Sequence, residues 1–389
     1  MAVATAGWQL TEEQEAFRKL ARELAETKVA PRAPEYDRTG EFPWDLVQLY
    51  REQGLFSLCI PEAYGGAGAD LLTLCVVIEE LARVDATAAL ILAVQELGAL
   101  PIILGANHEQ KSRWLPALAT GEKLAAFALT EPEAGSDAAS LRTRARRVEG
   151  GWVLDGTKRF ISNGSVADVL TVFAQTDPAL GHRGIVCFVV ERGTPGFAVT
   201  RLEEKMGLHA SPTAELAFDG CFVPDEQRIG EVGEGFKIAL MTLDRSRPGV
   251  AAQALGIAQG ALDYAVRYMK ERRQFGKLLA EFQGLQFMIA DMATQVEAAR
   301  QLLYYACRLI EAHGPGRLPA SVNRYAAMAK MFCSDTAMRV TTDAVQILGG
   351  YGYVKDHPVE RMMRDAKITQ IYEGTNQIQR LVIARSYFD

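Results

Sequence analysis

The period of the hydrophobic pattern changes twice along this 389-residue chain, and this change constrains the fold more than any other feature. From Leu10 to about Glu122, apolar residues recur at helical spacing. From about Lys123 to Gly235 they alternate every second residue, as in strands. After Glu234 the helical spacing returns. Helices followed by a β block and then long helices predict an α+β chain that is mainly α, rather than an alternating β/α barrel.

The pattern also predicts where the elements lie. Thr11 is expected to cap a first helix that ends before Pro31. Further helices are expected at Pro43–Gln53, Leu71–Arg83, Ala86–Leu97, His108–Ala119, Phe236–Arg272, Phe282–Ile310 and Ala320–Leu348. Strands are expected at Trp152–Ile161, Val169–Ala174, Ile185–Val190, Phe197–Leu202 and Ala214–Val223. The predicted domains are therefore 1–122 (helical), 123–235 (β) and 236–389 (a helical bundle).

Composition excludes several classes of protein. Hydrophobic residues make up 49% and charged residues 23%, which is typical of a globular chain, and the net charge of −6 gives no general attraction to nucleic acid. The most apolar run, Ala86–Leu104, is interrupted by polar residues, glycine and proline, so no membrane span is expected. Met1–Gly7 carries no charge and does not resemble a signal or transit peptide, so we expect a cytoplasmic (bacterial) protein, with the mitochondrial matrix as the alternative.

The spacing of the cysteines, histidines and glycines indicates which metal and nucleotide sites are not expected. The six cysteines form no C-x-x-C pair and the five histidines are isolated, so free thiols and no metal site are expected. Although the chain has 34 glycines, it contains neither a G-x-G-x-x-G fingerprint nor a P-loop. A dinucleotide-binding Rossmann fold is therefore disfavoured.

Four clusters have the composition of ligand sites, and each also has an ordinary structural reading. Phe127–Asp137 is a strand running into a turn rich in hydroxyls and glycine, or a plain interdomain loop. Leu243–Pro248 places a proline inside a helix, which indicates either a ligand-facing distortion or a simple kink. Glu271–Gly276 reads as a helix that ends at Gly276 with arginines in its last turn, and Gln346–Gly352 reads as a helix stop that also permits close approach of a phosphate.

A fifth segment, Ile371–Arg380, contains Glu373 beside a glycine and before a capping Thr375. It is either the N-terminus of a helix or a carboxylate in an apolar pocket, where its pKa would be raised and it would serve as a general base. Composition alone leaves both readings open.

These five segments, in this order, resemble the acyl-CoA dehydrogenase family of flavoproteins over nearly the whole chain, with local likeness to its short- and medium-chain branches. The resemblance implies an N-terminal helical domain, a central β-barrel-like domain, a C-terminal four-helix bundle, one FAD per subunit and a homotetramer. It also implies FAD contacts from Phe127, Leu129, Thr130, Ser136, Phe160, Ile161, Ser162, Arg272, Gln274, Phe275, Gln283, Gln346, Gly349, Gly350, Thr375 and Gln377. Substrate contacts are implied for Ser136, Asp244, Arg247 and Gly374.

The reaction that the resemblance implies is α,β-dehydrogenation of an acyl-CoA to the trans-2-enoyl-CoA. Glu373 would remove the α proton while hydride passes from Cβ to flavin N5, and the electrons would then go to electron-transferring flavoprotein. Some relatives carry the base on the preceding long helix, where Asp244 is the nearest acid, but Glu373 is preferred. An oxidase that uses O₂ and a non-catalytic flavin- or CoA-binding scaffold are the alternatives.

The acyl pocket is the least readable part of the sequence. By resemblance the helix around Leu92–Leu97 forms its floor, where Gln95 and Glu96 would shorten or polarise the pocket or face solvent. For Glu96 the solvent-facing reading is preferred. Short- to medium-length straight acyl groups are expected, with branched, cyclic or aromatic groups as alternatives.

Overall fold

The computed structural model describes residues 9–388, so the predictions made on Met1–Gly7 lie outside it. The first part of the chain is helical, and its elements are α1 (Glu12–Leu24), a π-helical turn η1 (Ala25–Val29), α2 (Ala33–Thr39), α3 (Trp44–Glu52), η2 (Leu55–Ser57), η3 (Glu62–Tyr64), α4 (Leu71–Ala82), α5 (Ala86–Gly105) and α6 (His108–Ala119). The predicted cap is confirmed, because the Thr11 hydroxyl accepts a hydrogen bond from the Gln14 backbone and the Gln14 side chain accepts one from the Thr11 backbone.

Helix α5 is longer than predicted, because Gly98 and Pro101 lie inside it instead of ending it. At Gly98 the helix approaches strand β1 so closely that a Cβ atom would lie 2.6 Å from the Cβ of Ala125. This glycine therefore serves packing rather than a chain break. By length and hydropathy α5 could cross a membrane, but 78% of its most apolar stretch is buried inside the protein, as in the core helix of a globular fold.

The middle of the chain forms one eight-stranded mixed sheet in the order β6-β7-β3-β2-β4-β5-β8, with β1 pairing parallel to β4. Its strands are β1 (Ala125–Ala128), β2 (Arg144–Val148), β3 (Gly151–Ser162), β4 (Val169–Gln175), β5 (Ile185–Glu191), β6 (Phe197–Leu202), β7 (Thr213–Pro224) and β8 (Arg228–Ile229), with short turns η4 (Pro178–Gly184) and η5 (Asp225–Gln227). The five predicted strands are confirmed. The sequence pattern missed β2, which is mostly exposed and rich in arginine and so carries little apolar alternation.

Strand β4 is buried on both faces and separates two cores. Leu170 and Val172 point into an apolar core enclosed by the strands, whereas Val169 and Phe173 pack against helices α5 and α6. The central β structure is thus a sheet around its own core, and its other face rests on the N-terminal helices.

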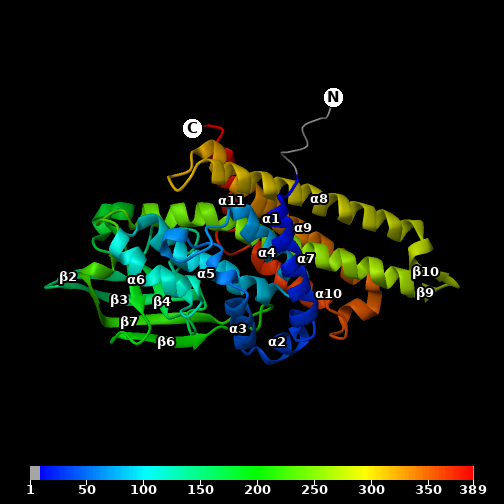
Figure 1. Ribbon diagram of the computed structural model, residues 1–389, viewed down its shortest axis with the longest axis horizontal. Helices are drawn as coiled ribbons and strands as arrows, with labels where there is room; N and C mark the ends of the chain where they lie inside the picture. The colour runs from blue at the N-terminus through cyan, green and yellow to red at the C-terminus, as the bar shows by residue number, and fades with distance from the viewer. Residues whose placement is uncertain (1–8, 389) are drawn as a thin grey trace.

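The last part of the chain is again helical: α7 (Gly235–Glu271), α8 (Gln283–Ala312), α9 (Ala320–Leu348), η7 (Gly349–Tyr353), α10 (Val359–Thr369) and α11 (Asn376–Arg385). Figure 1 shows α7 running along the long axis, from above the β sheet to the far end of the molecule. Pro248 lies within α7 without interrupting it. The predicted C-terminal helical domain is confirmed: α7, α8 and α9 pack together, and α10 and α11 pack on α9.

One predicted helix end is wrong. Helix α7 stops at Glu271, and the next residues form a small hairpin of β9 (Arg273–Gln274) and β10 (Lys277–Leu278), followed by η6 (Leu279–Glu281). Phe275 and Gly276 both have positive φ (52° and 75°), as the two central residues of a type I′ hairpin require. Gly276 therefore makes a hairpin turn rather than a helix stop.

Candidate active site

The site centres on the turn that joins α10 to α11. Glu373 has a φ of 52° and Gly374 a φ of 94°, so two successive residues are left-handed. Thr375 caps α11 by accepting a hydrogen bond from the Ile378 backbone. The two readings that the sequence left open are therefore compatible: the segment begins a helix, and its left-handed turn presents Glu373 just before that helix. Non-glycine residues rarely adopt this conformation, and such strain often accompanies function.

Three groups on α7 and α9 surround the Glu373 carboxylate. The Ser246 hydroxyl donates a hydrogen bond to its Oε2, and Arg247 and Lys330 contribute positive charge nearby. Burial raises the pKa of Glu373, whereas the hydrogen bond from Ser246 and the charges of Lys330 and Arg247 oppose that rise. The net direction is upward, as a general base working near neutral pH requires.

The solvent-facing reading of Glu96 is wrong. Its side chain is 3% exposed, its Oε2 has no hydrogen-bond partner, and a Cβ atom at Gly249 of α7 would lie 3.3 Å from it. Burial and the negative charge of Glu373 together raise the pKa of Glu96 well above the usual range of a carboxyl, so Glu96 is the neutral member of the pair. Gln95, one residue earlier, donates to the carbonyls of Leu118 and Lys123 and therefore supports the fold instead.

Asp244 and Arg247 are buried on α7 and bind each other, with 2.7 Å between Arg247 Nη1 and Asp244 Oδ1. Arg247 also donates to Asn323 at the start of α9. The Nε atoms of Arg245, Arg247 and Arg324 are buried without a partner. The three arginines make this corner between α7 and α9 positively charged, although these Nε atoms are not accessible to a ligand.

The residues predicted for the flavin on the β side come from two segments that the fold joins. The Arg159 backbone donates to the Thr130 carbonyl at 2.9 Å, and the buried Lys158 Nζ donates to the Leu129 carbonyl at 3.0 Å and to Glu131 Oε1 at 2.7 Å. These contacts bring the end of β1 and the turn after it against β3.

Phe160 stands out within β3, since the register shifts between Lys158 and Ile161 and Phe160 takes a φ of 59°. Its ring is 56% exposed and lies beneath the Arg159 guanidinium, so it presents an aromatic face at the sheet surface. Ile161 is different, because its side chain is buried in the sheet core, and only its backbone is available to a ligand. Ser162, on β3, is partly exposed.

Phe127 packs its ring 5.1 Å from that of Phe173, and Ser136 is exposed in the turn after β1. Another group of predicted residues lies on and around the β9–β10 hairpin. Figure 1 shows the β9–β10 hairpin at the end of the molecule opposite the β sheet. Here the Arg272 guanidinium lies 5.0 Å from the ring centroid of Tyr351 in η7. The residues predicted to bind FAD that are exposed on the hairpin, at the start of α8, at the end of α9 and in η7 are Gln274, Phe275, Gln283, Gln346, Gly349 and Gly350. Gln377 is exposed on α11. The fold thus gathers the predicted residues into three groups: the Glu373 turn, the β-side surface, and the distal end of α7 to α9.

Sequence reasoning missed three residues of this arrangement. Ser246 lies within a cluster that the sequence had singled out, and Lys158 stands two positions before Phe160, the first of the predicted flavin-facing residues, so proximity was a usable signal for both. Lys330 carried no such signal, because it stands in the middle of α9, 43 positions before Glu373.

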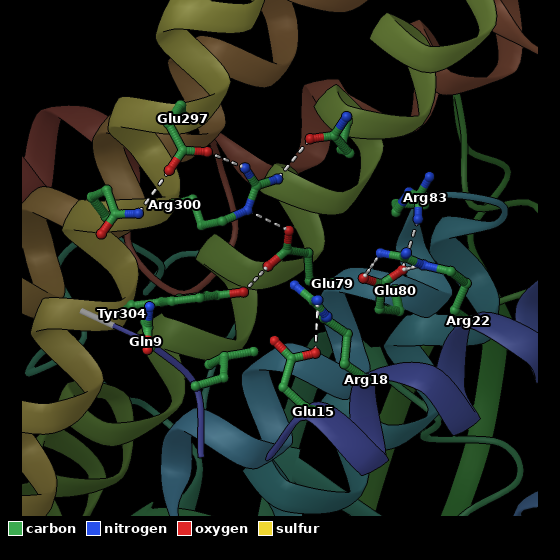
Figure 2. A pocket seen from close by; sticks show the side chains of 13 residues that line it. Gln9, Glu15, Arg18, Arg22, Glu79, Glu80, Arg83, Glu297, Arg300 and Tyr304 are labelled. Atoms are coloured by element: carbon green, nitrogen blue, oxygen red, sulfur yellow. Dashed lines mark hydrogen bonds and ion pairs between the residues drawn. The ribbon is translucent and has the colours of Figure 1, made fainter. Parts of the chain in front are cut away.

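A large cavity elsewhere does not share these residues. It measures about 670 Å³ and lies between α1, α4, α7 and α8. As Figure 2 shows, its charges satisfy one another: Arg300 and Tyr304 both bind the buried Glu79, and Arg22 and Arg83 bind Glu80. This network joins the N-terminal helices to α8.

The chain thus has a helical N-terminal part, a sheet around its own core and a C-terminal part of long helices, with Glu373 in a strained turn. Three family models match the chain in succession: the acyl-CoA dehydrogenase N-terminal domain over residues 11–122, the middle domain over 126–221 and the C-terminal domain over 233–388. The chain belongs to the acyl-CoA dehydrogenase family and is an enzyme of that class.

Individual relatives agree over their full length. An acyl-CoA dehydrogenase of Bacillus subtilis is 49% identical, with 97% of this chain and 98% of that one covered. Butyryl-CoA dehydrogenase from Megasphaera elsdenii is 47% identical, with a TM-score of 0.94 over 98% of this chain and 99% of that one. A chain in a solved structure of the electron transferring flavoprotein of Acidaminococcus fermentans matches at 49% identity and a TM-score of 0.94, with 98% of this chain and 99% of that one covered.

Two further matches concern ligands. An acyl-CoA dehydrogenase of Bacillus anthracis, solved in complex with FAD, is 33% identical with a TM-score of 0.91 over 98% of this chain and 68% of that one. Cyclohex-1-ene-1-carbonyl-CoA dehydrogenase of Geobacter metallireducens is 51% identical, with 97% of this chain and 98% of that one covered.

Proposed function

We propose that this enzyme dehydrogenates a short acyl-CoA thioester to its trans-2-enoyl-CoA with FAD as cofactor, and that Glu373 is the base that removes the α proton. The observation that carries the proposal is the Glu373 turn: a carboxylate of raised pKa, held by Ser246 and flanked by two cations. An α proton of a thioester is only weakly acidic, so its removal requires a base of suitably raised pKa. The negative charge that develops on the enolate oxygen must be stabilised by preorganised hydrogen-bond donors.

The residues present fit FAD. The β-side surface offers the exposed ring of Phe160 for stacking and the hydroxyls of Thr130, Ser136 and Ser162 as hydrogen-bonding groups. At the distal end, Gly349 has a φ of 62°, and neither it nor Gly350 has any atom within 4 Å of the place a Cβ would take, which leaves room for a phosphate. When bound, FAD supplies the hydride acceptor.

The distance between these two groups of residues bears on assembly. Because the β-side surface and the β9–β10 hairpin lie at opposite ends of one subunit (Figure 1), a single chain does not bring all of them around one flavin. We propose that the distal residues, including Arg272 and Phe275, complete the flavin site of a neighbouring subunit in a homotetramer. Phe275, which is 92% exposed, would then be covered by the partner subunit.

Glu96 supports a short acyl pocket. Helix α5 is buried along most of its length, and the neutral Glu96 carboxyl stands within electrostatic reach of Glu373. A polar group at this depth disfavours a long alkyl chain, since an unpartnered polar atom costs free energy against an apolar ligand. The CoA part of the substrate is assigned to the arginine-rich corner at Asp244 and Arg247.

Electron-transferring flavoprotein is the proposed electron acceptor, as the family resemblance implies. We propose a cytoplasmic location, with β-oxidation as the process served. Turnover with O₂ alone, measured as peroxide release, would instead make the enzyme an oxidase.

The central test is the Glu373→Gln variant. It should retain FAD but lose rapid anaerobic bleaching of the flavin by butyryl-CoA, with a fall in rate of about 10²- to 10⁴-fold. Glu226→Gln, an exposed site near the sheet, is the matched control and should bleach at the wild-type rate. Wild-type bleaching by Glu373→Gln would refute the assignment.

A cyclic acyl-CoA is the second candidate substrate. It is favoured by the match to the Geobacter metallireducens dehydrogenase and by Glu96, a second buried carboxyl within reach of the charge of Glu373. Cyclohex-1-ene-1-carbonyl-CoA has no α proton, so a base would have to act further along the ring. Bleaching rates with butyryl-CoA and cyclohex-1-ene-1-carbonyl-CoA, compared in wild type and Glu96→Gln, separate the two candidates.

A further inference from the structure

A buried lysine reaches the catalytic turn from the middle of α9. The Lys330 side chain has no exposed surface, and its Nζ lies 2.8 Å from the Gly374 carbonyl and 3.1 Å from Asn376 Oδ1. Burying an ammonium group is costly, so a lysine in this position must gain specific interactions in return.

The turn that it holds is strained and needs such contacts. A left-handed conformation is sterically unfavourable for a non-glycine residue, and Glu373 adopts it directly before the left-handed Gly374. The Gly374 carbonyl accepts from both Lys330 and the Gln379 side chain at 2.9 Å. A Cβ at Gly374 would lie 2.6 Å from that same Gln379 side chain, so no other residue fits there without displacing it.

The second contact extends into a small network on α9. Asn376, at the start of α11, accepts from Lys330 and Ser334 and donates to Asp335 at 2.7 Å. Asp335 in turn accepts from Gln370, the residue that follows α10. The turn is therefore tied to α9 at both of its ends, and Lys330 binds its middle.

We propose that Lys330 is the positioning residue of the catalytic turn: by binding the Gly374 carbonyl and Asn376 it fixes the Glu373 carboxylate for proton removal. This inference rests on the proposed role of Glu373 as the base. Lys330 does not touch the reacting atoms in this arrangement; it acts through the turn and through its charge.

Three charged groups around Lys330 affect its pKa. Glu373 faces it from the turn, Arg247 from α7 and Asp335 from its own helix. Burial and Arg247 lower the pKa of Lys330, to about 7, while the two carboxylates oppose this. In return, the Lys330 charge lowers the pKa of Glu373, so losing it raises that pKa further.

The test compares Lys330→Met, Lys330→Arg and the control Thr341→Val in the FAD-loaded enzyme. Thr341 is also buried on α9, but its hydroxyl bonds only to its own helix. In Lys330→Met the bleaching rate at saturating butyryl-CoA should fall about 100-fold, as for a misplaced catalytic group, with little change in the half-saturating concentration. In a plot of the bleaching rate against pH, the rate falls on the acid side where Glu373 becomes protonated. In Lys330→Met this acid limb should move to higher pH. Lys330→Arg keeps the charge and should keep the acid limb in place, and Thr341→Val should match wild type throughout.

Exchange of α protons with D₂O gives an independent readout. A 3-thia-acyl-CoA has no β hydrogen to lose, so exchange at its α carbon, followed by mass spectrometry, reports on the base alone. Slow exchange in Lys330→Met with normal flavin content supports the proposal. Wild-type exchange and an unmoved acid limb in Lys330→Met overturn it. If Lys330→Met does not fold, Lys330→Arg decides: a displaced acid limb despite the retained charge overturns the proposal. A wrong assignment of Glu373 would be recognised by a different result, namely that the Glu373→Gln variant bleaches its flavin at the wild-type rate.

Discussion

The buried pair of Lys158 and Glu131 offers a sharp test of how the β-side surface is built. Lys158→Met removes the 2.7 Å contact to Glu131 and the 3.0 Å contact to the Leu129 carbonyl. The Glu131 carboxylate is 5% exposed and would keep only its hydrogen bonds from the Arg142 and Thr143 backbones. Stranding a buried charge costs about 3–5 kcal/mol, which corresponds to a loss of about 4–6 °C in the melting temperature of a chain of this length.

Thermal unfolding and flavin content measure this effect. Lys19→Met, at an exposed lysine, is the control and should have the melting temperature of the wild type. The double variant Lys158→Met/Glu131→Gln removes the stranded charge, and it should recover most of the loss. Flavin content should fall with Lys158→Met, since the segments that carry Leu129 and Phe160 lose a contact between them. The reasoning is refuted if Lys158→Met melts with wild type, or if the double variant loses as much as the two single variants together.

The same pair predicts a pH dependence with a definite sign. In wild type the charge of Lys158 and the hydrogen bonds from Lys158, Arg142 and Thr143 hold the pKa of Glu131 below its ordinary value. A lowered folded pKa contributes stability that is present above the unfolded pKa and lost as pH falls through the folded one. Without Lys158, burial raises the Glu131 pKa instead. The deficit of Lys158→Met should therefore shrink as the pH falls from neutral into the carboxyl range, and a constant deficit would contradict this account.

Three further outcomes are expected. Ser246→Ala removes a hydrogen bond that lowers the pKa of Glu373, so the acid limb of bleaching should rise by about one pH unit, and an unmoved limb would show that the bond does not tune the base. Glu96→Gln replaces a neutral acid by an amide, so the Glu373 limb should stay in place; a downward shift would mean that Glu96 is ionised. Arg300→Met strands the buried Glu79 and should cost about 3–5 kcal/mol by thermal unfolding, largely restored by adding Glu79→Gln; no loss would mean that the cavity charges do not hold the helices together.

Much of the fold could be predicted because its signals are local. The switch from helical to alternating spacing gave the helical, β and helical parts, and helix α9 was predicted at its observed bounds. The errors at two glycines have different causes: the partner of Gly98 is distant in the sequence, whereas the hairpin around Gly276 is local but its strands are only two residues long. Gly98 was interpreted as a break, but it lies against β1, and Gly276 was interpreted as a helix stop, but it belongs to a hairpin.

The site divides in the same way. The sequence by itself determined which residue types are available: a glutamate beside glycine, a capping threonine, arginines on a long helix and hydroxyls after a strand. Only the tertiary structure decided that Ser246 binds Glu373, that Glu96 is buried within reach of the charge of Glu373, and that Lys330 binds the turn from 43 positions away. The physical reason is that a pKa and a hydrogen bond depend on burial and on neighbours within a few ångströms. Spacing along the chain does not encode these once helices from different parts of the sequence pack together.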